Sequence, residues 1–215
     1  MTLTVWGRLS SINVQKVMWA LDEIGLAYEH IPAGGDFGLI DTPAFRAMNP
    51  NGWVPVIDDD GTVVWESGAV LRYLCAAHSP GVLWPLDPGR RAQADQWMDW
   101  NQTALQPHLT GFFWGWWRTP TDRRDERRNA GLLAAAEADL ALLDAHLATR
   151  PYVGGDHLTM GDLPIATQLY RYLNLPIDRP ALPHVEAWYE RLTQRPAFRA
   201  QVMRPFDDLR GRLAY

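Results

Sequence analysis

Short apolar runs and one helical repeat alternate along residues 3–31. The runs at 3–6 and 27–31 contain β-branched and aromatic residues, and each predicts a strand. Between them, apolar residues recur at steps of three and four, which predicts a helix that ends at Gly25. The repeating positions are Val14, Val17, Met18, Leu21 and Ile24. The chain therefore opens as strand, helix, strand.

A hairpin pattern follows. The expected elements are a loop at 33–38, a helical turn at 43–48, strands at 54–57 and 62–65, and a helix at 67–78. The segment Asp58-Asp-Asp-Gly61 between the two apolar runs is typical of a tight turn. The order βαβαββα predicts a thioredoxin-like domain over residues 1–79, with helices on both faces of a sheet.

The rest of the chain shows no strand pattern. A Pro-rich segment at 80–88 predicts a linker, and an all-helical domain is expected over 89–215. Its expected helices cover 90–118, 123–149, 160–173 and 183–195. The fold class is therefore α/β plus all-α.

Composition and charge argue against several classes of partner and of site. A chain of 215 residues, 47% of them hydrophobic, can bury a core, and its net charge of −5 argues against a nucleic-acid partner. Cys75 is the only cysteine, which excludes an intramolecular disulfide and favours a cytoplasmic location. No apolar stretch approaches about eighteen residues, so no membrane span is expected. The six histidines are scattered, so no metal is expected.

Three segments carry candidate chemistry, and the first lies between the first strand and the first helix. The unpaired amides of a helix start attract an anion, and a hydroxyl or amide donor from Ser11 or Asn13 could hold a thiolate there. The alternative is that these residues only cap the helix.

The second segment is Asn49-Pro-Asn-Gly-Trp-Val-Pro55. If the Val54–Pro55 bond is cis, Val54 can offer its N–H and C=O groups to an extended peptide, and we expect a cis bond. The alternative is an ordinary proline of an edge strand.

The third segment places Glu66 and Ser67 at a helix start. The Ser67 hydroxyl and nearby amides suit a carboxylate, while Glu66 suits an ammonium group, so together they fit an α-amino acid head. The alternative is an ordinary helix cap.

In this order and spacing, the three segments resemble the cytosolic glutathione transferase family along nearly the whole chain. The matching motifs are Ser-Ser-Ile-Asn-Val-Gln-Lys-Val, Asn-Pro-Asn-Gly-Trp-Val-Pro-Val and Glu-Ser-Gly-Ala-Val-Leu-Arg-Tyr-Leu. The resemblance implies glutathione as co-substrate, a homodimer and a role in detoxification. It implies Ser11 as the activating residue, as in theta-like members, ranked above Asn13, the nu-like position, with the adjacent Ser10 as a further alternative.

The resemblance also assigns the docking segment and the γ-glutamyl site. Val54 and Pro55 dock the peptide backbone, and Glu66 with Ser67 holds the γ-glutamyl group. Trp53 departs from the pattern, because many members have a basic residue there for the glycine carboxylate. An arginine, a backbone amide or the Trp53 indole N–H must replace that residue, because Lys16, the only lysine, lies on the first helix.

Two features of the second half complete the prediction. Thr159 and Asp162 have the spacing of a capping box, resemble the family's folding motif and are expected to stabilise the fold. The aromatic cluster around Phe113, Trp114 and Trp117 is either core or a wall for a small hydrophobic electrophile.

The expected activity is conjugation of glutathione to that electrophile. One alternative is a glutathione-dependent disulfide reductase or peroxidase of the nu-like type, which Asn13 supports. Another is a binding protein that keeps the fold without catalysis, against which the joint presence of Ser11, Asn13, Glu66 and Ser67 argues.

Overall fold

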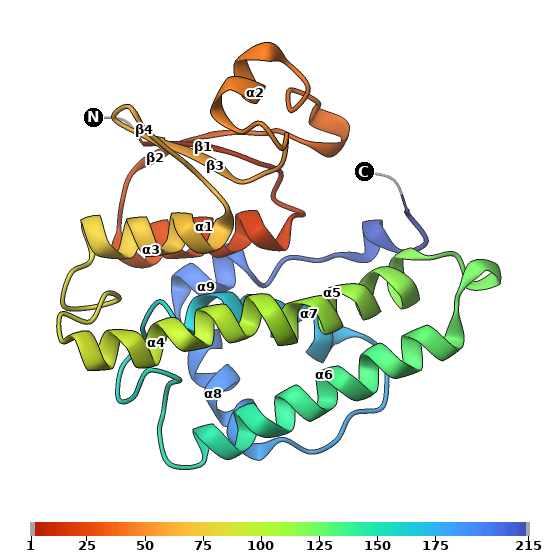
Figure 1. Ribbon diagram of the computed structural model, residues 1–215. Helices are drawn as coiled ribbons and strands as arrows, with labels where there is room; N and C mark the ends of the chain where they lie inside the picture. Colours follow the sequence, from red (N-terminus) through yellow and green to blue (C-terminus); the bar gives the residue numbers. More distant parts are fainter. Residues whose placement is uncertain (1–2, 214–215) are drawn as a thin grey trace.

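The structure is a computed structural model that describes residues 3–213 (Figure 1). Its first part contains β1 (Leu3–Trp6), α1 (Ile12–Ile24), β2 (Tyr28–Ile31), α2 (Pro43–Met48), β3 (Val56–Asp59), β4 (Thr62–Trp65) and α3 (Ser67–His78). The predicted order βαβαββα is confirmed. A single 3₁₀ turn, Gly35–Phe37, lies in the predicted loop. The outer limits 1 and 215 of the two predicted domains lie outside the described residues.

The four strands form one mixed sheet in the order β2-β1-β3-β4. β1 runs parallel to β2 and antiparallel to β3, and β3 is antiparallel to β4. Inward residues of β1, Leu3 and Val5, are buried against α1 and α3, which cover one face of the sheet, while α2 lies on the other (Figure 1).

One predicted strand begins later than expected. The second apolar run was expected to form a strand over 54–57, but β3 starts at Val56, so Val54 and Pro55 precede it. Because Pro55 has no N–H group, it cannot donate to the ladder, and pairing begins only after it. The Val54–Pro55 peptide bond is cis, and that prediction is confirmed.

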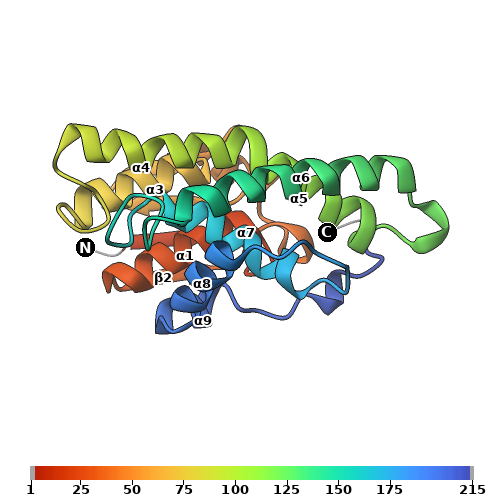
Figure 2. The ribbon, with the colours of Figure 1, turned by 90° about the horizontal axis from the view of Figure 1, so that it is seen from below.

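The second part is helical. It contains α4 (Pro88–Trp100), α5 (Gln106–Phe112), α6 (Glu126–Leu147), α7 (Asp162–Asn174), α8 (Pro183–Thr193) and α9 (Pro196–Gln201). π-helical turns at Asn101–Leu105 and Phe113–Arg118 extend α4 and α5 into the long helix expected over 90–118. Figure 2 shows α7 in the middle of the helical part, with α4 and α6 on one side of it and α8 and α9 on the other. No helix within residues 3–213 is both long and apolar enough to cross a membrane.

The sequence pattern missed α9. This six-residue helix begins with a proline, so periodicity cannot reveal it. It forms where Phe198 is buried against Trp19 of α1, with ring centroids 4.8 Å apart. Tertiary packing, not local preference, therefore stabilises this turn.

Helix α1 lies between the two parts. Every residue from Val14 to Leu21 is buried. Val14, Val17, Met18 and Leu21 pack under the sheet, whereas Trp19 and Ala20 join the core of the helical part. Polar residues on this helix are therefore forced into the interior, and Lys16 is one of them.

Candidate functional site

A cleft of about 520 Å³ lies between the two parts of the molecule. One wall comes from the start of α1 and the loops before α2 and β3, and the other from α5, its continuation and α7. The lining residues are Arg8, Ser11, Ile12, Asn13, Gly34, Gly35, Ile40, Gly52, Trp53, Val54, Gln106, Thr110, Trp114 and Arg171. Five residues singled out by the sequence meet here: Ser11, Asn13, Trp53, Val54 and Trp114.

Ser11 is the residue that precedes α1. Its backbone is extended, with φ −86° and ψ 122°, and its carbonyl accepts the Gln15 amide at 2.9 Å. Its side chain makes no capping bond. The alternative that this hydroxyl only caps the helix is therefore wrong, and the hydroxyl remains available at the edge of the cleft.

Asn13 belongs to a partly buried polar group that also includes Lys16 and Gln106. The Lys16 Nζ atom donates to Asn13 Oδ1 at 2.9 Å and to Gln106 Oε1 at 2.6 Å. Lys16 is 1% exposed. Sequence reasoning placed Lys16 on the first helix but assigned it no role, because the acceptor Gln106 lies 90 residues further along the chain.

The burial of Lys16 has an electrostatic consequence. Desolvation lowers the pKa of Lys16 to about 7, although the negative charge of Glu66 acts in the opposite direction. The pKa of this amine therefore lies close to neutral pH, and both of its acceptors, Asn13 and Gln106, line the cleft.

The docking segment keeps its backbone groups open. Asn49 shapes it, because its Nδ2 donates to the Trp53 carbonyl at 2.8 Å and its Oδ1 accepts the Asn51 amide at 3.0 Å. Within residues 3–213, neither the N–H nor the C=O of Val54 takes part in a hydrogen bond. Trp53 is 72% exposed at the edge of the cleft, and Pro55 is buried.

Glu66 and Ser67 lie at the start of α3, outside the set of residues that lines the cleft. Glu66 has φ 70° and ψ 115°, a conformation that costs free energy in a non-glycine residue, and its side chain makes no capping bond. The alternative that Glu66 is an ordinary cap is therefore wrong. Ser67 is buried directly after it.

Only one of the three predicted aromatic residues borders the cleft. Gln106, Thr110 and Trp114 follow each other at steps of four and share one helix face. Phe113 and Trp117 lie on a neighbouring face, buried with Phe206 and Leu209, and the Trp117 indole donates to the Phe206 carbonyl at 3.2 Å. This corrects the predicted wall: Phe113 and Trp117 are core residues, because both are buried against the C-terminal segment that carries Phe206 and Leu209.

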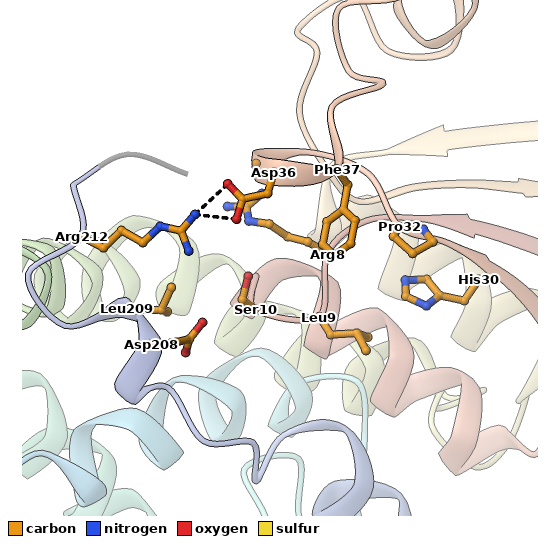
Figure 3. Close-up of a pocket in the computed structure, with 11 residues that line it drawn as sticks. Arg8, Leu9, Ser10, His30, Pro32, Asp36, Phe37, Asp208, Leu209 and Arg212 are labelled. Atoms are coloured by element: carbon orange, nitrogen blue, oxygen red, sulfur yellow. Dashed lines mark hydrogen bonds and ion pairs between the residues drawn. The ribbon is translucent and has the colours of Figure 1, made fainter.

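Ser10 lines a neighbouring cavity of about 300 Å³ (Figure 3). This cavity lies between the β1–α1 loop and the C-terminal segment, and two of its lining residues form an ion pair, in which Arg212 Nη2 donates to both carboxylate oxygens of Asp36, at 2.7 and 2.5 Å. The Ser10 carbonyl accepts a hydrogen bond from Arg171 Nη2 at 2.6 Å. Arg171, which sequence reasoning missed, thus ties α7 to the loop that carries Ser11.

Asp162 is fully buried at the start of α7. Its Oδ2 accepts the Thr159 amide at 2.9 Å and the Thr159 hydroxyl at 3.2 Å. Its Oδ1 accepts the Val153 amide at 2.9 Å and the Trp188 indole at 3.0 Å. No cluster of metal-ligating side chains occurs in the part of the chain that the structure describes.

Comparison with known proteins assigns the chain to a family. Family models for the glutathione S-transferase N-terminal and C-terminal domains match residues 1–76 and 122–191. The chain is 43% identical to glutathione S-transferase GstB of Escherichia coli K12, covering 94% of this chain and 99% of that protein. It is 46% identical to a theta class glutathione S-transferase of Xanthomonas axonopodis pv. citri, solved with glutathione bound, over 95% and 98% of the two chains with a TM-score of 0.91. The chain therefore belongs to the glutathione S-transferase family and is a glutathione transferase.

Proposed function

We propose that the cleft binds glutathione with its thiol at the start of α1, keeps the thiol ionised near neutral pH, and holds a small hydrophobic electrophile against the sulfur. One observation carries this proposal. The Ser11 hydroxyl and the Asn13 amide nitrogen border the cleft at a helix N-terminus, and neither has a hydrogen-bond partner within residues 3–213. The helix amides and both donors favour a thiolate over a thiol.

We propose that the rest of glutathione follows the wall that carries Val54 and reaches the start of α3, beyond the residues that line the cleft. The open N–H and C=O groups of Val54, ahead of Pro55, suit the cysteinyl backbone. The start of α3 suits the γ-glutamyl head, with Ser67 facing its carboxylate and Glu66 its ammonium group. The Xanthomonas relative with glutathione bound supports this ligand.

The opposite wall suits the electrophile. Trp114 offers a large, rigid apolar surface next to Thr110. Among the described lining residues, Arg8 and Arg171 carry positive charge. Because Arg8 lies beside Gly34, we propose that Arg8 binds the glycine carboxylate in place of the missing basic residue at Trp53.

A second candidate activity is the nu-like reduction of disulfides or peroxides with glutathione. The observation that favours it is the Asn13 amide at the cleft. Assays with a halogenated aromatic electrophile and with a mixed disulfide of glutathione separate the two activities. A non-catalytic binding role would leave both assays blank while glutathione still binds.

The thiolate assignment has a direct test. Ser11→Ala is expected to raise the thiol pKa of bound glutathione with little loss of affinity, because the hydroxyl contacts only the sulfur. Losing such a donor costs about 1.5 to 3 kcal/mol, or roughly a ten- to hundredfold fall in thiolate-limited rate. Asn13→Ala is the matched variant, and ultraviolet absorbance follows the thiolate. A shift only in the Asn13 variant makes asparagine the activator. No shift in either variant contradicts the assignment.

We also propose a cytoplasmic homodimer with domain limits 1–79 and 89–215 around a linker at 80–88. α3 ends at His78 and α4 begins at Pro88, which supports these limits. The edge strand β4 exposes Val63 and Trp65, which supports association. Sedimentation velocity tests the dimer.

A further inference from the structure

One buried ammonium group joins two amides from opposite walls of the cleft. Asn13 lies in the first turn of α1, and Gln106 is the first residue of α5. The Lys16 Nζ atom reaches both side-chain oxygens, at 2.9 Å and 2.6 Å. Lys16 itself lines neither described cavity beside the start of α1.

This contact fixes which way the Asn13 amide faces, and at Gln106 Oε1 the Lys16 ammonium acts together with Asn101 Nδ2, which donates to the same oxygen at 3.4 Å. An ammonium group has donors and no acceptor, so only the amide oxygens can face it. The nitrogens of Asn13 and Gln106 are then left with two N–H bonds each. Within residues 3–213 neither nitrogen donates to another group. Both residues line the cleft, so their unused donors are available to a ligand in it.

We propose that Lys16 is a positioning residue, whose ammonium group holds the Asn13 amide with its NH₂ group toward the sulfur of glutathione and the Gln106 amide with its NH₂ group toward the second substrate. This inference rests on the proposed function, in which the thiol lies at the start of α1. Without Lys16, the Asn13 amide could turn its oxygen toward the thiolate, and two negative ends would then face each other.

The electrostatics of the group support this role. Burial of a charge disfavours it, and the low pKa of Lys16, about 7, reflects that cost. Glu66, at the start of α3, is the charged residue whose field favours the ammonium form. A thiolate in the cleft would act in the same direction as Glu66. Thiolate and ammonium would therefore stabilise each other.

A purely structural role is the competing explanation, because Lys16 also links α1 to α5. The two roles differ in their effect on two ligands. Glutathione has an ionisable thiol, whereas S-methylglutathione shares its backbone and lacks that thiol. A structural role affects the binding of both ligands, whereas a positioning role leaves the binding of S-methylglutathione unchanged and changes the ionisation of the glutathione thiol.

The first test is Lys16→Met, which removes the charge and the donors at similar length, beside Lys16→Arg, which keeps both. We expect Lys16→Met to raise the thiol pKa of bound glutathione by about one unit or more, a tenfold shift of the thiol–thiolate equilibrium toward the thiol. Affinity for S-methylglutathione should change less than about twofold, and Lys16→Arg should recover part of the shift. Equal losses for both ligands would contradict the proposal.

A double-mutant cycle tests whether Lys16 acts through Asn13. In an Asn13→Ala background, Lys16→Met should shift the thiol pKa less than it does in the wild-type background, since the amide that Lys16 orients is gone and only the effect of its charge is left. Additive shifts would mean that Lys16 acts by charge alone and would overturn the positioning role.

A measurement on the unmutated residue covers the case in which Lys16→Met does not fold. Because Lys16 is the only lysine, selective ¹⁵N-lysine labelling yields a single side-chain signal. Glutathione should shift the titration of this signal to higher pH, and S-methylglutathione should not. No response to glutathione would contradict the proposal.

The thiol pKa of bound glutathione distinguishes failure of the proposed function from failure of the role of Lys16. If the thiol bound to the wild-type protein titrates as it does in free glutathione, the proposed function itself fails. If the wild-type protein lowers this pKa and Lys16→Met leaves it unchanged, only the role of Lys16 is contradicted.

Discussion

Lys16 and Asp162 are two buried charged side chains with different surroundings. Asp162, in the helical part, is 0% exposed and accepts four hydrogen bonds from Val153, Thr159 and Trp188. Lys16, in the first part, has two acceptors, Asn13 and Gln106.

The partners reveal the difference in role. The groups around Asp162 lie inside the fold and line no cleft beside α1. The partners of Lys16, Asn13 and Gln106, both line the cleft, and the amide NH₂ group of each makes no hydrogen bond within residues 3–213. A buried charge whose partners are all internal stabilises the fold, whereas one whose partners border a cavity organises a site. Four predictions test this contrast, beginning with the largest expected effect.

Asp162→Ala should produce the largest loss of stability. It leaves four buried donors without an acceptor, and losing the charged centre of such a network costs about 3 to 5 kcal/mol. The free energy of unfolding, measured with urea, checks this. Asp162→Asn is the control, since it keeps one acceptor and should lose less. A change in the thiol pKa of bound glutathione in an Asp162 variant that still folds would contradict the contrast.

Glu66→Gln should weaken glutathione binding by about 1.5 to 3 kcal/mol, because a charge-assisted hydrogen bond to the ligand ammonium is lost. Isothermal titration calorimetry measures this. Glu66→Gln also removes the field that favours the charged form of Lys16, so the pKa of Lys16 should fall below its present value of about 7. Ser67→Ala is the matched control, because it should weaken binding and leave the Lys16 titration in place.

Stability should depend on pH through Lys16. Its pKa is about 7 in the folded protein and 10.5 as an ordinary lysine, so between these values the unfolded chain binds the extra proton. Stability therefore rises with pH across this window, by at most about 1.4 kcal/mol per pH unit, and the full cost of the buried charge is present below pH 7. Urea unfolding between pH 7 and 9 checks the slope. Lys16→Met should flatten it, and an unchanged slope would show that another group causes it.

Thr159→Val should have the smallest effect. It removes only the 3.2 Å hydroxyl contact to Asp162 and keeps the shape and the backbone donor. The expected loss is about 0.5 to 1 kcal/mol in the free energy of unfolding, measured with urea. A loss as large as that of Asp162→Ala would mean that the hydroxyl, not the backbone amides, dominates this cap.

Local chemistry in the sequence determined the order of elements and pointed to five residues that line the cleft, Ser11, Asn13, Trp53, Val54 and Trp114. Apolar spacing predicted the helix under the sheet, and the segments around Ser11, Val54 and Glu66 were recognisable because capping, proline and turn preferences act over a few residues. The Thr159–Asp162 spacing predicted a contact that the structure contains.

Only the tertiary structure decided which side chains face the cleft and which are buried. The aromatic cluster offered three candidates, and packing against Phe206 removed Phe113 and Trp117 and left Trp114. From the sequence alone, Lys16 looks like an ordinary charged residue of a helix. Its burial follows from α1 being covered on two sides, and its acceptor Gln106 is 90 residues away. Arg171 reaches Ser10 over 161 residues. Such contacts depend on how distant elements pack, and no local spacing encodes them.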